Sequence, residues 1–348
     1  MKEKIKVGVI GAGVWGEFVL WSYSSNPYVE LVGIADLNAD RAGEMAKKYG
    51  APKTWTDYRQ MIDEEKLDIV SIVTPDYLHK QIVLDCTAKK INILLEKPVA
   101  TTMDDCNAII NAVRNSGVTF MTNYFQRWIP QVSEAKAAIV RGDLGEIVTG
   151  HAKIDDAIVV ATDMVKWAQS SSPIFFIMVH NIDMVRWLIN SEAIEVYAKK
   201  QRKHLVGLGV ETDDAVQAMV TFENGATVTF ESNWILPANF TGLNDHDVRL
   251  VGTQGTAYID LTNQGLKIFS KPQGIFDFPN KGTLYGNDIH GQLAGCILLS
   301  VAHFVDCVRN GTKPVVTLKD SEMSTAIACA IAESLSQNGV VKLKGSEG

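Results

Sequence analysis

The stretch Val7-Gly8-Val9-Ile10-Gly11-Ala12-Gly13-Val14-Trp15-Gly16 decides the fold of this chain of 348 residues. An apolar run ends at Ile10, and three glycines follow with the spacing G-x-G-x-x-G just before a helical pattern. Gly11 permits a tight bend, Gly13 lets the backbone approach a pyrophosphate, and Gly16 lets the helix pack closely on the strand. The helix N-terminus offers N–H groups and a positive dipole end to the anion. The stretch predicts a dinucleotide-binding turn, and the alternative is a glycine-rich turn without a ligand.

Asp36 ends the second expected strand, 20 positions after Gly16, where an acid that binds the adenosine ribose is expected. Its carboxylate would accept hydrogen bonds from the ribose hydroxyls and would repel the 2′-phosphate of NADP. Leu37 supplies no compensating cation, although Arg41 lies a helical turn further on. The sequence therefore predicts NAD as the cofactor. The alternative is a surface carboxylate that caps the following helix.

The first 125 residues alternate short apolar runs with helical patterns. The expected strands are apolar on both faces, as buried parallel strands are. They cover residues 6–10, 31–35, 69–73, 91–94 and 119–121, and the expected helices cover 14–24, 40–49, 77–89 and 102–116. This alternation predicts a doubly wound parallel sheet, a Rossmann domain that binds the dinucleotide, in residues 1–125.

Longer strands with period-two alternation follow, so residues 126–348 are predicted to form an α+β domain with a large open, mainly antiparallel sheet. The expected strands are 146–155, 194–202, 213–222, a strand around 226–234, 247–252, 256–261 and 265–270. The expected helices are 131–141, 175–190, 290–309 and 320–337, and a loop is expected over 271–289. The polar face of the sheet is predicted to be solvated or to contact another subunit.

Composition narrows the function classes. The formal net charge is −7 and no Lys/Arg block occurs, which argues against a nucleic-acid or anionic-membrane surface. No apolar run approaches the ~20 residues of a membrane span, and the N-terminus lacks the pattern of a signal peptide. A cytoplasmic location is therefore predicted. The five cysteines have no metal or redox spacing and are expected to be reduced and mostly buried in helices.

Glu96-Lys97-Pro98 directly follows an expected strand. The carboxyl ends of strands face the ligand crevice in doubly wound folds, so Lys97 could reach a nicotinamide pocket. By position alone, a solvated loop lysine is an equal alternative.

Together with the glycine motif, Thr74-Pro75, His79 and the tail Gly311-Thr312-Lys313-Pro314-Val315, this tripeptide resembles the Gfo/Idh/MocA family from the first strand to the last helix. The resemblance implies a Rossmann domain, an open-sheet α+β domain for substrate binding and oligomerisation, and redox chemistry at a secondary hydroxyl of a sugar or cyclitol. It implies that Lys97 is catalytic and that a homodimer or homotetramer forms through the second sheet. The expected cofactor-binding residues are Gly11, Gly13, Val14, Trp15, Gly16, Asp36, Thr74, Pro75, His79, Glu96 and Lys97.

The family's second motif usually reads Asp-x-Gly-x-His-x-x-Asp, and here the stretch runs from Phe176 to Asp183. His180 and Asp183 match the motif, whereas Phe176 and Met178 replace its aspartate and glycine. His180 is the candidate base because an unperturbed imidazole titrates near neutral pH. A satisfied core histidine is the alternative. His180 and Asp183 could suggest a metal pair, but no third ligand is evident, and no bound metal is expected.

The resemblance then implies a mechanism in which His180 takes the hydroxyl proton and Lys97 stabilises the developing alkoxide. Asp183 would hold a neighbouring hydroxyl or orient the site. Asp155 or Asp156 could replace the carboxylate missing at Phe176, and the expected substrate-binding residues are Lys97, Asp156, Phe176, His180 and Asp183.

The ring of Phe176 could favour a glycoside with an apolar substituent over a free cyclitol, or could turn into the core. Two other functions stay open for the chain. One is a redox-neutral enzyme that oxidises, eliminates or hydrolyses, and then reduces again with the same bound NAD. The other is a non-catalytic NAD-dependent sensor.

Overall fold

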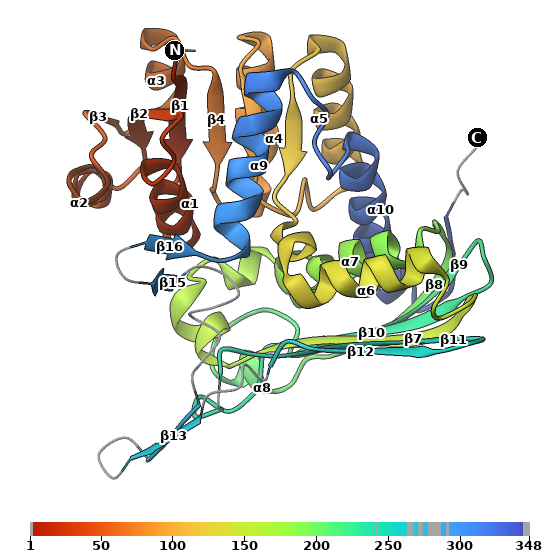
Figure 1. Ribbon diagram of the computed structural model, residues 1–348. Coiled ribbons are helices and arrows are strands. Elements are labelled where there is room, and N and C mark those ends of the chain that lie inside the picture. Colours follow the sequence, from red (N-terminus) through yellow and green to blue (C-terminus); the bar gives the residue numbers. More distant parts are fainter. Residues whose placement is uncertain are drawn as a thin grey trace. The chain divides into compact units, whose positions relative to one another are not determined.

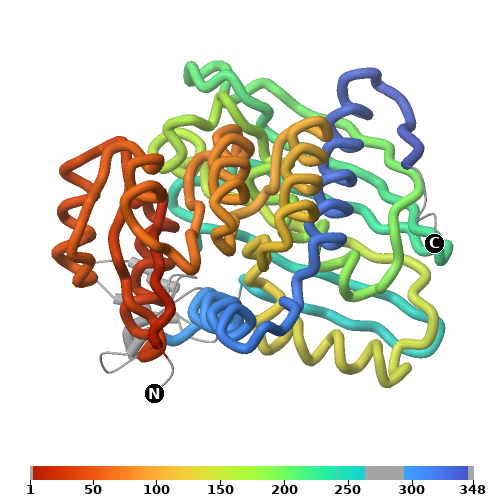
Figure 2. Tube along the Cα trace, turned by 90° about the horizontal axis from the view of Figure 1, so that it is seen from above, coloured from red at the N-terminus to blue at the C-terminus, as the bar shows by residue number. Residues whose placement is uncertain are grey.

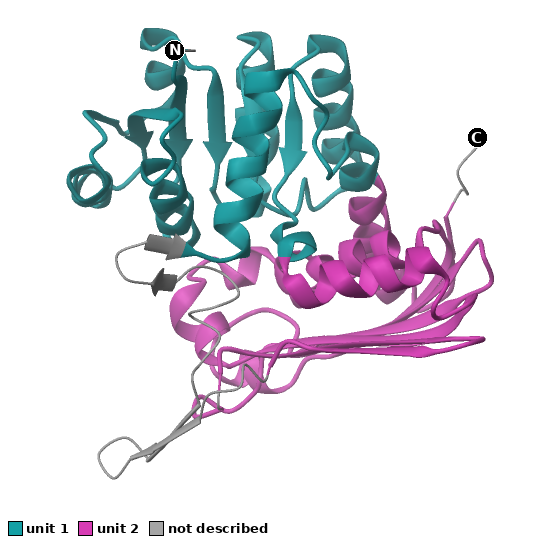
Figure 3. Ribbon diagram, in the orientation of Figure 1, with its two compact units in different colours: residues 1–128, 284–322 teal, residues 129–283, 323–348 magenta. Residues whose placement is uncertain are grey.

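The chain divides into two compact units, which Figure 3 shows in different colours. The structure is a computed structural model and describes residues 3–240, 242–262, 267–270, 274–277, 287–289 and 292–343. Unit 1 comprises residues 1–128 and 284–322, and unit 2 comprises residues 129–283 and 323–348. The sequence suggests a single domain boundary after residue 125. In the structure, residues 284–322 also belong to unit 1. The functions assigned to the two predicted domains stay predictions.

Unit 1 is built on six parallel strands in the order β3-β2-β1-β4-β5-β6, which is the strand order of a Rossmann fold. The strands are β1 (Ile5–Ile10), β2 (Val29–Ala35), β3 (Lys53–Trp55), β4 (Ile69–Ile72), β5 (Asn92–Leu95) and β6 (Phe120–Thr122). Val7, Val9 and Ile72 have no exposed surface, as expected for strands covered on both faces. The predicted doubly wound parallel sheet is confirmed, and the edge strand β3 was not expected.

The helices of unit 1 connect these strands and complete its core. They are α1 (Val14–Ser24), α2 (Ala39–Tyr49), α3 (Tyr58–Glu64), α4 (His79–Ala88), α5 (Met103–Ser116) and α9 (Cys296–Asn310). Thr102 starts α5 because its side chain accepts the backbone N–H of Asp105. α9 comes from far along the chain and packs against α1, as the blue and red tubes of Figure 2 show. This packing is the physical reason that α9 belongs to unit 1.

Unit 2 contains a seven-stranded sheet in the order β12-β11-β7-β10-β9-β8-β17. Neighbouring strands are antiparallel except for the parallel pair β7 and β10. The strands are β7 (Ile147–Asp156), β8 (Ala193–Gln201), β9 (Ala215–Phe222), β10 (Thr227–Asn233), β11 (Asn244–Gly252), β12 (Thr256–Asp260) and β17 (Val341–Lys342). The predicted open, mainly antiparallel sheet is confirmed.

Helices cover one face of the unit 2 sheet. α6 (Pro130–Arg141) and α7 (Val179–Ile189) lie along it in Figure 1. Alternate residues of β10, such as Val228 and Phe230, are buried, whereas Thr229 between them is exposed. Two π-helical turns, η3 (Val160–Met164) and η5 (Ile174–Met178), precede α7, and η5 runs directly into it. π-Helical turns occur frequently at functional sites.

The remaining described elements are short, apart from α10 (Leu318–Gln337), within which the boundary between the units falls. The stretch 271–289 was expected to be a loop, and this was wrong for its described residues. They form β14 (Gly274–Asp277) and β15 (Asn287–Ile289), which pair with β13 (Lys267–Ser270) and β16 (Gln292–Ala294). The five cysteines, all among the described residues, form no disulfide. Over the described ranges, every helix is too short or too polar to span a membrane.

Candidate functional site

The glycine turn of unit 1 joins β1 to α1 and has the geometry of a phosphate-binding turn. Gly11 has a φ of +99°, and a side chain there would meet the carbonyl group of Val73 at 2.4 Å. A Cβ on Gly16 would lie 2.2 Å from the carbonyl oxygen of Gly11, so helix and strand approach closely only because both residues lack side chains. Around Gly13, in contrast, no atom lies within 4 Å of an added Cβ. The turn therefore leaves open space where a pyrophosphate would approach the N-terminus of α1.

Two further predicted residues begin α1. Val14 is 53% exposed at the helix N-terminus. The ring of Trp15 packs against Phe18 and Phe125, with ring centroids 5.6 and 5.8 Å apart. Trp15 thus contributes to packing within unit 1, and a contact with cofactor stays a prediction for both residues.

Asp36 follows β2 and is tied to the glycine turn. Its Oδ2 accepts the backbone N–H of Ala12 at 2.7 Å, and its Oδ1 accepts that of Asn38 at 2.8 Å. The helix cap of α2 is Asn38 rather than Asp36, which removes the simple capping alternative. Arg41 donates from Nε to the carbonyl oxygen of Ala12 at 2.8 Å and pairs with Glu17 at 2.9 Å. The Arg41 cation is therefore already balanced by a carboxylate and offers little compensation for a 2′-phosphate.

The segment after β4 supplies the next predicted residues, Thr74, Pro75 and His79. Among the described residues, the buried Oγ1 of Thr74 has no hydrogen-bond partner. A polar ligand atom or an ordered water can satisfy such a buried hydroxyl. Because β4 lies beside β1, Thr74 and the glycine turn meet at the same edge of the sheet. Open space at Gly13, the Asp36 carboxylate and this hydroxyl together fit a bound NAD.

Glu96-Lys97-Pro98 follows β5 and is anchored on its buried side. Glu96 is 8% exposed and accepts the side-chain N–H of Asn123 at 2.6 Å, and Asn123 accepts the hydroxyl of Ser300 at 2.7 Å. Burial raises the pKa of the Glu96 carboxyl, while the Asn123 hydrogen bond and the Lys97 charge act in the opposite direction. Pro98 is buried, the Lys97–Pro98 peptide is cis, and the side chain of Lys97 is partly exposed.

In unit 2, α7 carries His180 and Asp183, which are 4% and 1% exposed. Residues three apart share one side of a helix. The hydroxyl of Ser324 lies 3.3 Å from Oδ1 of Asp183 and donates to it. Asn181 accepts a hydrogen bond from Nε2 of His246 on β11, over 2.7 Å. Burial lowers the pKa of His246 to about 3, so it stays neutral and anchors α7 to the sheet.

Phe176 lies in η5, one turn before His180, within a group of aromatic rings. Its ring centroid lies 5.9 Å from that of Trp167 and 5.5 Å from that of Trp234, both in edge contacts. Trp234 is fully buried, whereas Phe176 and Trp167 are partly exposed. These three residues are called the aromatic cluster below.

Asp156 ends β7 on the side that faces the aromatic cluster. Its Oδ2 accepts the indole N–H of Trp234 at 3.0 Å, and its Oδ1 accepts the side-chain N–H of Asn244. With 1% of its surface exposed, the carboxylate holds unit 2 together, and its predicted role in substrate binding stays a prediction. Asp155 points to the other face because successive strand residues alternate.

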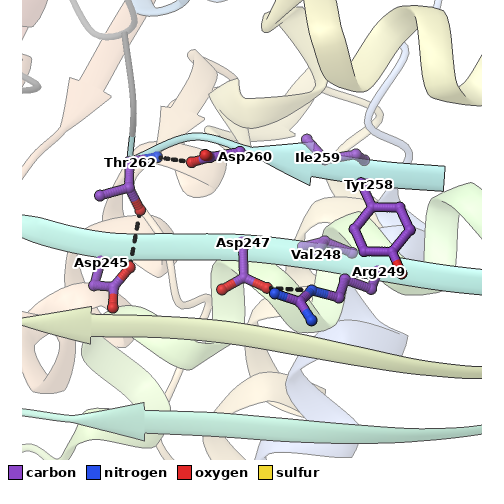
Figure 4. A pocket seen from close by; sticks show the side chains of 8 residues that line it. All are labelled: Asp245, Asp247, Val248, Arg249, Tyr258, Ile259, Asp260 and Thr262. Atoms are coloured by element: carbon purple, nitrogen blue, oxygen red, sulfur yellow. Dashed lines mark hydrogen bonds and ion pairs between the residues drawn. The ribbon is translucent and has the colours of Figure 1, made fainter.

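The other face of the unit 2 sheet holds charged side chains and a pocket, which Figure 4 shows. Its lining comprises Asp245, Asp247, Val248, Arg249, Tyr258, Ile259, Asp260 and Thr262. His246 points away from this pocket, toward α7, so the pocket and α7 lie on opposite faces. Burial and the nearby charge of Glu231 raise the pKa of Asp155 on this face to about 7. The pocket contains none of the predicted site residues.

The structure therefore gathers the predicted residues into two groups, one in each unit. The residues expected to bind the cofactor lie in unit 1, and His180, Asp183, Phe176 and Asp156 lie in unit 2. Sequence reasoning missed the polar residues that hold these groups, which are Asn123, Ser300, His246, Trp234 and Asn244. The available signal was weak: Ser300 is a polar residue within the apolar helix α9, and Asn123 follows the end of β6.

Two family models match the chain. Residues 5–124 match the oxidoreductase family with an NAD-binding Rossmann fold, and residues 132–258 match the GFO/IDH/MocA C-terminal domain. Scyllo-inositol 2-dehydrogenase (NAD(+)) of Bacillus subtilis is 25% identical over 98% of this chain and 96% of its own length. Trans-1,2-dihydrobenzene-1,2-diol dehydrogenase of Mus musculus is 22% identical over 93% of this chain and 94% of its own.

A solved structure confirms the fold. Scyllo-inositol dehydrogenase from Lactobacillus casei, with bound NAD(H) and scyllo-inositol, matches with a TM-score of 0.83 and 18% identity over 98% of this chain and 99% of that chain. The two family models lie side by side and together span well over half of the residues. The chain therefore belongs to the GFO/IDH/MocA family of oxidoreductases, and unit 1 carries its NAD-binding Rossmann fold.

Proposed function

We propose that this protein transfers a hydride between a secondary hydroxyl of a sugar, glycoside or cyclitol and NAD, giving a keto product. The observation that carries the proposal is the glycine turn, where open space at Gly13 meets the buried hydroxyl of Thr74. The substrate class is supported by relatives named for scyllo-inositol and for trans-1,2-dihydrobenzene-1,2-diol. We also propose a cytoplasmic location, because the cytosol keeps thiols reduced and the five cysteines form no disulfide.

The chemistry divides between two bonds of the substrate. The glycine turn, Asp36 and Thr74 would hold NAD, whose nicotinamide would supply the acceptor for the hydride, that is, for the hydrogen and electron pair of the C–H bond. His180 accepts the proton of the hydroxyl, so that the oxygen keeps its electrons and a C=O bond forms. Lys97 stabilises the negative charge that develops on this oxygen. Asp183, held by Ser324, orients His180 or a neighbouring substrate hydroxyl.

The aromatic cluster refines the proposed substrate. Phe176, partly exposed and packed on the buried Trp234, stands where the family motif usually has an aspartate, and its ring offers no acceptor for sugar hydroxyls. The carboxylate of Asp156 does not replace it simply, since Asp156 is only 1% exposed and its oxygens accept hydrogen bonds from Trp234 and Asn244. A ring carrying an apolar or aromatic substituent, such as an aryl glycoside, should therefore bind better than a small, fully hydroxylated cyclitol.

A panel of sugars, inositols and glycosides, assayed for NADH formation by absorbance, tests the proposed reaction. A dehydrogenase releases NADH in step with the keto product. Cleaved product without net NADH would support the redox-neutral alternative, in which the same NAD is reduced and reoxidised. NAD binding without turnover of any panel member would support the sensor.

The substrate preference is tested separately with Phe176→Asp and Phe176→Leu. The aspartate should shift catalytic efficiency toward myo-inositol and free glucose, and the leucine, which keeps an apolar side chain, should not. If free polyols are the better substrates of the native enzyme and Phe176→Asp leaves the order unchanged, the proposed preference is wrong.

We also propose that the protein forms a homodimer or homotetramer through the polar face of the unit 2 sheet. Tyr258 on this face is 71% exposed and lies under the guanidinium of Arg249, 5.3 Å from the ring centroid. Exposed aromatic and arginine side chains are typical of interface centres. Sedimentation should give a dimer or larger species, and Tyr258→Glu should shift it toward the monomer. A monomeric native protein would contradict the proposal.

A further inference from the structure

His79 begins α4 and has no exposed surface. Its Nδ1 lies 2.8 Å from the carbonyl oxygen of Pro98, and its Nε2 lies 3.1 Å from the carbonyl oxygen of Thr74. Thr74 belongs to the segment after β4 and Pro98 to the segment after β5, and these strands are neighbours in the sheet. The His79 ring therefore lies between the segments that follow β4 and β5. Both segments are at the carboxyl ends of the strands, on the edge of the unit 1 sheet that carries the glycine turn.

The protonation of the ring decides which bridge is a hydrogen bond. Burial lowers the pKa of His79, with nearby Asp76 and the surrounding carbonyl oxygens acting in the opposite direction. A neutral imidazole has one N–H donor. The contact with Pro98 is the shorter of the two, which favours Nδ1 as the donor to the Pro98 carbonyl oxygen. The carbonyl oxygen of Thr74 then lies 3.1 Å from the unprotonated Nε2 and receives no hydrogen bond from it, so the bond to Pro98 is the one that acts.

The same tripeptide is also held on its other side. The backbone N–H of Glu96 donates to the carbonyl oxygen of Ile72 at 2.9 Å, and its carboxylate accepts the Asn123 hydrogen bond. Glu96 and Pro98 are buried, and Lys97 between them is partly exposed. Both neighbours of Lys97 are therefore fixed to unit 1, and the lysine side chain is presented from a backbone tied at two points.

We propose that His79 is a positioning residue for Lys97, whose backbone it fixes through the hydrogen bond from Nδ1–H to the Pro98 carbonyl. The inference rests on the role proposed above for Lys97. A displacement of roughly 1 Å in a catalytic group can lower the rate about 10²-fold. Loss of the His79 bridge should therefore lower kcat. The cofactor-binding role expected for His79 from the sequence is the alternative, and it predicts weaker NAD binding, whereas a positioning role predicts an unchanged Kd for NAD.

Two substitutions separate the two ring nitrogens. The amide N–H of His79→Asn lies close to the position of Nδ1 and can still donate to Pro98. The amide of His79→Gln reaches instead toward the position of Nε2, beside Thr74. We expect His79→Asn to keep kcat within about threefold of the native value and His79→Gln to lose tenfold or more, with NAD dissociation constants within about threefold in both. His204→Gln, at an exposed histidine, is the matched control.

Three results would overturn the inference. Equal kcat values for the Asn and Gln variants would show that the Nδ1 bond does not matter. A loss of NAD affinity parallel to the loss of kcat would make His79 part of the cofactor site. A His79→Gln change that lowers kcat further in a Lys97→Ala background would show that it does not act through Lys97, since residues acting as one unit are not additive.

A readout without substrate distinguishes failure of this inference from failure of the proposed function. Hydrogen exchange, measured by mass spectrometry, should show weaker protection of residues 96–100 in His79→Gln and native protection in His79→Asn. Unchanged protection of residues 96–100 in His79→Gln would show that the His79–Pro98 hydrogen bond does not hold this segment, even if the enzyme is active. If the protection pattern holds but Lys97→Ala turns over normally, the role of Lys97 fails while the bridge itself stands.

Discussion

Replacing Gly13 by alanine should separate NAD binding from folding. Gly13 has φ −65° and ψ −166°, an extended conformation that alanine adopts without strain, and its added Cβ would meet no atom within 4 Å. A glycine-to-alanine change at such a position stabilises a protein by about 0.4–1 kcal/mol through the unfolded chain. Gly13→Ala should therefore have a melting temperature equal to or slightly above that of the native protein.

The same methyl group would occupy the space through which a pyrophosphate approaches the N-terminus of α1. A lost hydrogen bond to a charged group is worth about 1.5–3 kcal/mol, which corresponds to a roughly 10- to 150-fold weaker Kd. Titration calorimetry with NAD gives this ratio directly, and thermal unfolding gives the stability. The expected signature is a large loss of affinity in a fully stable protein.

Gly16→Ala is the matched control, because the same methyl group there meets backbone. Its Cβ would lie 2.2 Å from the carbonyl oxygen of Gly11, so α1 must move away from β1. Such overpacking costs about 1–3 kcal/mol, and the melting temperature should fall. A Gly13→Ala protein that binds NAD as tightly as the native protein, or that loses stability as Gly16→Ala does, would contradict the open space at Gly13 as the site of pyrophosphate approach.

Further substitutions test the remaining assignments. Asp36→Ala should narrow a preference for NAD over NADP in kcat/KM, and a native enzyme that is faster with NADP would contradict the NAD assignment. Lys97→Ala should lower kcat roughly 10²-fold with NAD affinity retained, as expected for loss of one donor to a developing oxyanion, and near-normal turnover would refute its role. Asp155 titrates at about 7 in the folded protein and near 4 when unfolded, so the native state binds more protons between these values. The free energy of unfolding should therefore fall as pH rises from about 4 to 7, and Asp155→Asn should make this fall less steep in urea denaturation. Equal slopes in the two proteins would contradict the assignment.

The parallel sheet of unit 1 could be predicted because its strands are apolar on both faces and the glycine spacing fixes where β1 ends. β3 and α3 were missed for a physical reason. Lys53 and Thr54 of β3 are exposed and only Trp55 is buried, so three residues at the sheet edge leave no readable alternation. The π-helical turn η5 was also missed, since a periodicity of 3.6 residues does not distinguish a π turn from the start of α7.

Sequence motifs were enough to select Lys97, His180 and Asp183 as candidate catalytic residues. The residues that hold such candidates in place became apparent only from the fold. Nothing local in the sequence pairs Asn123 with Ser300, because α9 returns to unit 1 only in the folded chain. Likewise, the hydrogen bond between Trp234 and Asp156 depends on the parallel pairing of β7 with β10. The alternation of polar and apolar residues along each strand does not reveal which strands pair. Sequence patterns therefore identify the groups that carry chemistry more readily than those that hold them.

The late position of α9 matters for how the protein is synthesised. The strands of unit 1 are complete at Thr122, whereas α9, which packs on α1, begins only at Cys296. At roughly 5–20 residues per second, a nascent chain waits on the order of ten seconds or more before this helix emerges. During that interval the surface of α1 that α9 covers is available to chaperones or to other nascent chains. A fragment ending at Trp128 would keep that surface of α1 exposed permanently, because it lacks α9.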